Sequence, residues 1–140
     1  MGSKNKIAKH LLPFILERLN PDQHYVEPFV GGANPLKKQI QYLQNVGFRC
    51  CSYQDLEIPE KSLIYCDPPY RGTTGYKMGF DSGAFWQWCR DKAAEGHTVL
   101  ISEYSAPADF ICLLEIEHFT TVNSNKDKRI EKLFTFNELL

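Results

Sequence analysis

In the first segment of the chain, apolar residues recur at steps of three and four positions among polar ones. This spacing predicts an amphipathic helix over residues 5 to about 19, with a kink at Pro13. A mostly apolar run, 24–30, follows a break in the pattern and predicts a buried strand. That strand leads directly into Gly31 and Gly32, so we expect a helix and then a strand that ends at a glycine pair.

The rest of the chain continues to alternate between helical and strand-like patterns. Continuous or alternating apolar runs predict strands, and apolar residues at helical spacing predict helices. The predicted elements are a short helix over 35–45, strands at 48–52 and 62–66, a helix over 81–95, a strand at 97–102, a turn or short helix at 106–110, and an antiparallel pair at 113–119 and 133–136. Strands that alternate with helices predict an α/β domain with a mostly parallel sheet.

Length and composition argue against several classes of protein. The 140 residues suit one hydrophobic core, and a hydrophobic content of 43% is too high for global disorder. The longest uninterrupted apolar stretch, 11–16, is too short to cross a membrane, and the first six residues predict no signal peptide. Five cysteines without a CxxC pair indicate reduced thiols in a cytoplasmic protein, and no metal site is expected.

Candidate chemistry gathers where two predicted strands end. Ligands of α/β sheets bind at the carboxyl ends of the strands, and the ends near Glu27 and Asp67 both carry unusual residues. Gly31 and Gly32 leave room for a ligand against the backbone, although glycine pairs also serve ordinary turns. Glu27 has two interpretations: an exposed position on an edge strand, or a carboxylate that accepts a hydrogen bond from a bound ligand.

The tetrapeptide Asp67-Pro68-Pro69-Tyr70 is more specific. Its two prolines stiffen the backbone and remove two donors, so the Asp67 carboxylate and the Pro68 carbonyl are held as neighbouring acceptors. Two acceptors suit the two hydrogens of a planar amino group, and they direct the lone pair of its nitrogen toward an electrophile. The Tyr70 ring is suited to stack on a base taken out of a duplex. A rigid turn with an incidental tyrosine is the alternative.

A basic cluster near the end of the chain is the main candidate for contacts with phosphate. The formal net charge is −1, so binding to nucleic acid has to depend on a local patch. Lys126, Lys128 and Arg129 form the only dense basic group in the sequence. They are expected to contact phosphates if the protein acts on DNA, and to form a solvated face otherwise.

Three other conspicuous residues are given structural roles. Trp86 and Trp88 lie on the predicted helix over 81–95 and are expected to pack in the core, because aromatic residues at helical spacing usually do so. His97 precedes a predicted strand and is expected to be a surface or capping residue.

Two motifs in order along the chain carry a resemblance to a known family. Residues 25–34 (YVEPFVGGAN) and 64–70 (IYCDPPY) resemble the Dam-like, D12 class DNA adenine-N6 methyltransferases, particularly phage-type members. The first six residues are similar to the family's N-terminal cofactor motif, and residues 128–134 are similar to its C-terminal motif. The resemblance implies the three-layer, Rossmann-like sheet of methyltransferases that use S-adenosylmethionine (AdoMet), here with one strand fewer.

The resemblance also implies an activity and a role for each motif. The activity is methyl transfer from AdoMet to the N6 amino group of a flipped-out adenine in DNA, as in restriction-modification, with no metal. Target adenine would be held by Asp67, Pro68, Pro69 and Tyr70. The cofactor residues would be Phe29, Gly31 and Gly32 under AdoMet, Glu27 and Pro28 in the same pocket, Lys4 near the cofactor carboxylate, and Asp55 against the cofactor adenine.

The interval between the two motifs is short for this family. Asp67 follows Gly32 by 35 positions, whereas the family has there a strand with an acidic residue for the cofactor ribose and a separate target-recognition region. We therefore expect residues 1–140 to form a single catalytic domain without a target-recognition domain and without a ribose ligand. Sequence recognition would then need a second chain.

Three functions remain open from the sequence alone. The chain is an active adenine-N6 methyltransferase, or an internally deleted remnant that folds and binds AdoMet without selecting or methylating DNA, or a non-enzymatic interaction domain. The first two share the same motifs, so the motifs do not separate them.

Overall fold

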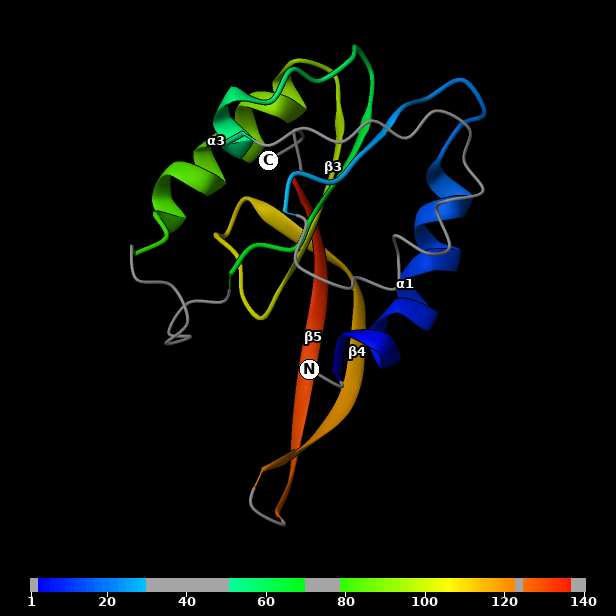
Figure 1. Ribbon diagram of the computed structural model, residues 1–140, viewed down its shortest axis with the longest axis vertical. Coiled ribbons are helices and arrows are strands. Elements are labelled where there is room, and N and C mark those ends of the chain that lie inside the picture. The colour runs from blue at the N-terminus through cyan, green and yellow to red at the C-terminus, as the bar shows by residue number, and fades with distance from the viewer. Residues whose placement is uncertain (1–2, 30–50, 70–78, 123–124, 137–140) are drawn as a thin grey trace.

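The computed structural model describes residues 3–29, 51–69, 79–122 and 125–136. Helices and strands alternate up to the third strand, and a long hairpin follows (Figure 1). The elements are α1 (Ser3–Arg18), β1 (Tyr25–Val26), the 3-10 helix η1 (Tyr53–Asp55), β2 (Leu63–Cys66), α3 (Ser82–Ala94), β3 (Thr98–Glu103), β4 (Phe110–Val122) and β5 (Asn125–Phe136). The predicted mixed α/β fold is confirmed.

The strands form one five-stranded sheet in the order β1-β2-β3-β5-β4. β1, β2 and β3 run parallel, β5 runs antiparallel to β3, and β4 runs antiparallel to β5. The predicted parallel strands and the predicted antiparallel pair are therefore both present. The antiparallel strands are longer than predicted, because their outer parts carry mostly polar residues and a hydrophobicity pattern does not reveal them.

Helix α3 shows how local sequence sets the ends of an element. The Asp81 side chain accepts a hydrogen bond from the backbone N–H of Ala84 at 3.0 Å and caps the start of the helix. The helix ends at Glu95, and Gly96 follows with φ +96°, a conformation that side chains disfavour. Both signals lie in the sequence, and the predicted helix over 81–95 is confirmed.

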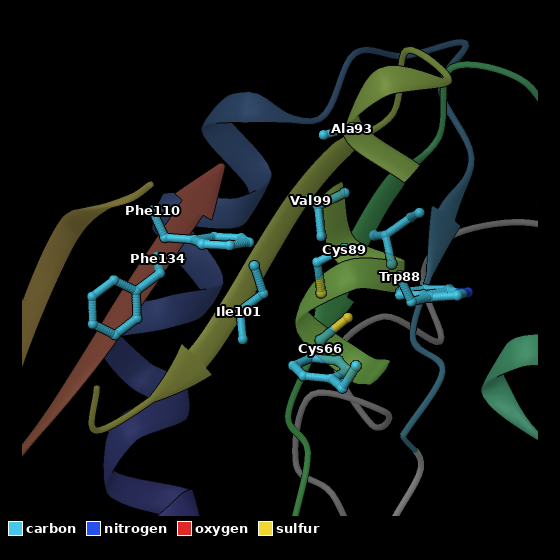
Figure 2. Close-up of a cluster of buried hydrophobic side chains, with 10 residues drawn as sticks. Cys66, Trp88, Cys89, Ala93, Val99, Ile101, Phe110 and Phe134 are labelled. Atoms are coloured by element: carbon cyan, nitrogen blue, oxygen red, sulfur yellow. The ribbon is translucent and has the colours of Figure 1, made fainter. Parts of the chain in front are cut away.

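The two faces of the sheet carry separate hydrophobic cores. Along β2, Leu63 and Tyr65 point into a cluster with Leu11 and Ile15 of α1. The alternate residues point to the other face, where α3 packs. Figure 2 shows this second cluster, whose labelled members are Cys66, Trp88, Cys89, Ala93, Val99, Ile101, Phe110 and Phe134. The sheet thus lies between α1 on one side and α3 on the other (Figure 1).

The tryptophans pack as predicted. Trp88 is buried in the α3-side core, and the Trp86 ring lies 4.8 Å from the ring of Phe110, measured between centroids. Among the described residues, no helix is both long enough and apolar enough to span a membrane.

Three other sequence predictions differ from the structure or fall outside it. The prediction for His97 is wrong: its ring is buried, and its Nδ1 accepts a hydrogen bond from the backbone N–H of Ser62 at 3.1 Å, which ties the start of β3 to the start of β2. The predicted helix over 35–45 lies outside the described residues. Most of the predicted strand over 48–52 does too, and Cys51 and Ser52 are not in a strand.

Candidate functional site

Two strand ends lie next to each other at one edge of the sheet. β1 pairs with β2 in parallel, with Tyr25 opposite Leu63 and Val26 opposite Ile64. Residues 27–29 continue from the end of β1 and residues 67–69 from the end of β2, so both segments start from the carboxyl edge. The sequence analysis placed the candidate chemistry at these two strand ends. Gly31, Gly32 and Tyr70 lie outside the described residues.

The buried side chain of Tyr65 lies close to both acidic residues of this edge. Burial raises the pKa of the Tyr65 phenol well above its ordinary value, and the negative charges of Asp67, Glu131 and Glu27 add to the rise. A hydrogen bond with Ser102 acts in the opposite direction. Asp67 and, more weakly, Glu27 thus both raise the pKa of this one buried phenol.

Tyr25 and Glu27 are also neighbours. Burial is the main cause of the raised pKa of Tyr25, and the charge of Glu27 is the second. Glu27 itself is half-buried. Of its two interpretations, the exposed edge position is therefore wrong, and the carboxylate that accepts a hydrogen bond from a bound ligand stays a prediction.

The backbone around Asp67 is held by buried neighbours on both sides. Cys66 and Pro68 are fully buried, while Asp67 and Pro69 are half-buried. The first proline has a fixed φ and no N–H, so the turn after β2 has few alternative conformations. The sequence prediction of a stiff segment after this strand is consistent with that burial.

Aromatic rings pack around the end of β1. The centroid of the Phe29 ring lies 5.0 Å from that of Tyr53, 5.9 Å from that of Phe80 and 5.5 Å from that of Phe85. The contact with Tyr53 places η1 beside the end of β1, and Asp55 is the exposed last residue of that short helix. The structure thus brings Phe29 and the segment that carries Asp55 together.

Lys4 lies in the first turn of α1. The helix contacts β4 and packs on the sheet through Leu11 and Ile15. In Figure 1, α1 runs from the side on which the parallel strands end toward the start of β1. Lys4 is thus at the start of the helix that covers this face of the sheet, and its side chain is outside the described part of the chain.

The chain matches the family model of the D12 class N6 adenine-specific DNA methyltransferases over residues 33–110, which is more than half of its length. It belongs to this family. The match includes Asp55 and the tetrapeptide at 67–70, and it leaves out the end of β1, the glycine pair and the basic cluster. No curated protein and no solved structure matches the chain significantly.

In this member of the D12 family, the basic cluster lies on a hairpin that projects past the sheet edge. Lys132 of β5 is opposite Glu103, the last residue of β3, so the earlier residues of β5 extend beyond the end of β3. Lys128 lies four positions further out, about 13 Å along the strand. Figure 1 shows the β4–β5 hairpin projecting from the body of the protein. The cluster is on the same side of the sheet as Asp67.

The three basic residues do not share one surface. Lys126 is opposite Thr121 and Lys128 is opposite Phe119, which puts the two lysines on one face of the hairpin, whereas Arg129 is opposite His118 on the other face. All three are exposed. The Nζ atom of Lys128 lies 2.7 Å from Oε1 of Glu117, so this lysine is already in an ion pair.

Sequence reasoning missed a group of buried polar residues beside Asp67. Ser102 and Glu131 are buried, and Ser102 Oγ donates to Oε1 of Glu131 at 2.6 Å. One signal was available: Glu131 is two positions from Leu133 and therefore shares its face of β5. The predicted strand began only at residue 133, so the alternation of inward and outward side chains was not extended back to Glu131. Among the described residues, no group of three or more potential ligands could hold a metal ion.

Proposed function

We propose that this chain transfers the methyl group of AdoMet to the N6 amino group of adenine in DNA. The observation that carries the proposal is the adjacency of the β1 and β2 ends, which Glu27 and Asp67 follow directly along the chain. Membership of the D12 class supports the reaction type. The proposed fold is the three-layer, Rossmann-like methyltransferase sheet with one strand fewer, and α1 and α3 on opposite faces support it.

Asp67 and the Pro68 carbonyl would hold the adenine. Both accept hydrogen bonds, and the target amino group has two hydrogens to donate, so the pair fixes the plane of that group and directs the nitrogen lone pair. Pro69 would stiffen this segment, and the Tyr70 ring would stack on the base. AdoMet supplies an electrophilic methyl group when bound. The carboxylate then favours the positive charge that develops on N6 and is suited to accept the proton that N6 loses.

The end of β1 has the chemistry that AdoMet requires. AdoMet is a cation that carries an adenine ring, and this edge offers the half-buried carboxylate of Glu27 and the half-buried rings of Phe29 and Tyr53. We assign Pro28, Gly31 and Gly32 to the same pocket, Lys4 to the cofactor carboxylate, and Asp55 to the cofactor adenine. An acidic side chain accepts hydrogen bonds from an adenine amino group, and a lysine pairs with a carboxylate.

Contact with DNA is assigned to the projecting hairpin. Lys126, Lys128 and Arg129 are exposed beyond the edge that carries Asp67, where the backbone of a duplex would pass. Because only 35 positions separate Gly32 from Asp67, we propose that residues 1–140 are one catalytic domain without a target-recognition domain. Binding by this chain would then be weak and unselective unless a second chain contributes sequence recognition.

The test is transfer of radiolabelled methyl groups from AdoMet to DNA that contains adenine. Wild-type protein is expected to label this DNA and to leave adenine-free DNA unlabelled, and Asp67→Ala is expected to abolish labelling while AdoMet binding persists in calorimetry. No labelling at high enzyme concentration and low salt would exclude catalysis by this chain. AdoMet binding without labelling would instead favour the deleted remnant, which the short interval before Asp67 suggests. No AdoMet binding would favour an interaction domain.

A further inference from the structure

A line of buried polar side chains crosses the α1-covered face of the sheet. It consists of Tyr65 from β2, Ser102 from β3 and Glu131 from β5, which are 2%, 0% and 3% exposed. Ser102 Oγ donates to Oε1 of Glu131 at 2.6 Å, and the Tyr65 hydroxyl hydrogen-bonds with Ser102. The line thus connects the parallel strand β2, which leads to Asp67, with the antiparallel strand β5.

The order of donors along this line is fixed at one end. Ser102 directs its single hydroxyl proton to Glu131, whose side-chain oxygen accepts it. The same hydroxyl contacts the Tyr65 phenol, and this contact lowers the Tyr65 pKa against the larger, opposite effect of burial. Removing Glu131 would release the Ser102 proton and allow the Tyr65 hydroxyl to turn.

Packing alone gives no reason for polar residues at these positions. Their neighbours on this face are Leu100, Ile116 and Leu133, and a buried carboxylate is costly unless hydrogen bonds compensate for the lost water. Apolar side chains of similar size would join β3 to β5 without that cost. A polar line retained at the carboxyl edge of the sheet therefore indicates a role at that edge.

The line ends next to Asp67. Tyr65 and Asp67 are two positions apart at the end of β2, and the charge of Asp67 acts directly on the Tyr65 phenol. We propose that Ser102 and Tyr65, anchored by Glu131, are positioning residues that fix the end of β2 and thereby the direction of the Asp67 carboxylate. This inference rests on the proposed function only in so far as it predicts an effect on methyl transfer.

Two variants that each delete one oxygen test the inference. Tyr65→Phe leaves the bond between Ser102 and Glu131 intact, and Ser102→Ala removes the middle of the line. Both are expected to lower kcat for methyl transfer by about tenfold or more, with KM for AdoMet within twofold of wild type, because the reacting group is misplaced and the cofactor site is not. The matched control is Thr135→Val, which removes a hydroxyl bond of 2.9 Å from β5 to the Val99 carbonyl of β3. It is expected to leave kcat unchanged.

A second measurement does not depend on catalysis. The side-chain carboxyl carbon of Asp67 can be followed by NMR in protein labelled at aspartate and assigned with Asp67→Asn. Tyr65→Phe and Ser102→Ala are expected to change its chemical shift and its titration, and Thr135→Val is not. An unchanged Asp67 signal in both variants overturns the inference, and so does a changed signal with unchanged kcat in an active enzyme. If wild-type protein does not methylate DNA but the signal moves, the proposed function fails while the positioning of Asp67 stands.

Discussion

The ring of Tyr53 provides a direct test of how the proposed cofactor side of the site is held. This half-buried ring lies among four others, with centroids 5.0 Å from Phe29, 5.3 Å from Trp88, 6.0 Å from Phe85 and 6.2 Å from Phe80. Through its contact with Phe29, the Tyr53 ring joins η1 to the end of β1. We expect Tyr53→Ala to loosen that contact and to reduce both stability and AdoMet affinity.

The structure sets the size of the effect. Aromatic pairs contribute about 0.5–1.5 kcal/mol each beyond the area they bury, and their contributions are not additive within one cluster. Since the ring is only half-buried, we expect Tyr53→Ala to lower the free energy of unfolding by about 2–3 kcal/mol, below the usual cost for a fully buried aromatic residue. For a domain of this size that corresponds to a fall in Tm of about 6–12 °C.

Urea unfolding and calorimetry with AdoMet measure the two effects separately. Tyr53→Phe keeps the ring contacts and is the matched control, expected to unfold within about 0.5 kcal/mol of wild type. AdoMet affinity is expected to fall about tenfold in Tyr53→Ala, which is about 1.4 kcal/mol, and to be unchanged in the control. Asp55→Ala should lower affinity without lowering stability, because Asp55 is exposed. Wild-type stability and wild-type affinity in Tyr53→Ala would refute the reasoning.

Three further predictions concern charge. The pKa of Tyr65 is raised in the folded protein. Its contribution to stability is therefore complete below the ordinary tyrosine pKa of about 10 and is lost as pH rises above that value. Absorbance titration should show alkaline unfolding, and Tyr65→Phe should move this unfolding to higher pH. The hydrogen bond from Arg90 lowers the pKa of Asp109. The contribution of this pair to the free energy of unfolding is therefore present above the ordinary aspartate pKa and is lost as pH falls below it. In Asp109→Asn, the acid unfolding curve should lack this pH-dependent loss of stability. Lys126→Ala should weaken DNA binding at all sequences and should reduce by about one the slope of the logarithm of the binding constant against the logarithm of the salt concentration. The control is Lys92→Ala on α3, where Lys92 pairs with Glu95, and it should change neither quantity. Equal slopes in both variants would contradict the assignment of DNA contact to the hairpin.

Local signals made α3 and the end of β2 predictable. The capping side chain of Asp81 and the positive φ of Gly96 are short-range features of the sequence, and both are used in the structure. The apolar run before Asp67 has no interruption, as expected for a strand buried on both faces. The end of β2 borders the most specific motif, so that half of the site could be located from the sequence.

Other features depended on contacts that no local pattern reveals. β1 is only two residues long, although the apolar run suggested seven, and pairing stops before Pro28, which has no N–H to continue a ladder. His97 was misplaced because its partner is distant in the sequence: its Nδ1 accepts a hydrogen bond from the backbone N–H of Ser62, 35 positions earlier. Glu131 was missed for the same reason, since its partner lies on another strand.

β5, near the end of the described chain, supports the sheet that carries the candidate site. β5 lies between β3 and β4, and its residues Leu133 and Phe134 belong to the α1-side core and the α3-side core respectively. Glu131, on the same strand, bonds to Ser102 of β3. The family match stops at residue 110, before most of this hairpin. β5 pairs with β3, and β3 pairs with β2, the strand that leads to Asp67, so the position of Asp67 depends on residues outside the matched segment. A variant in β5 should therefore be interpreted first as a change to the proposed active site, and only then as a change to the hairpin.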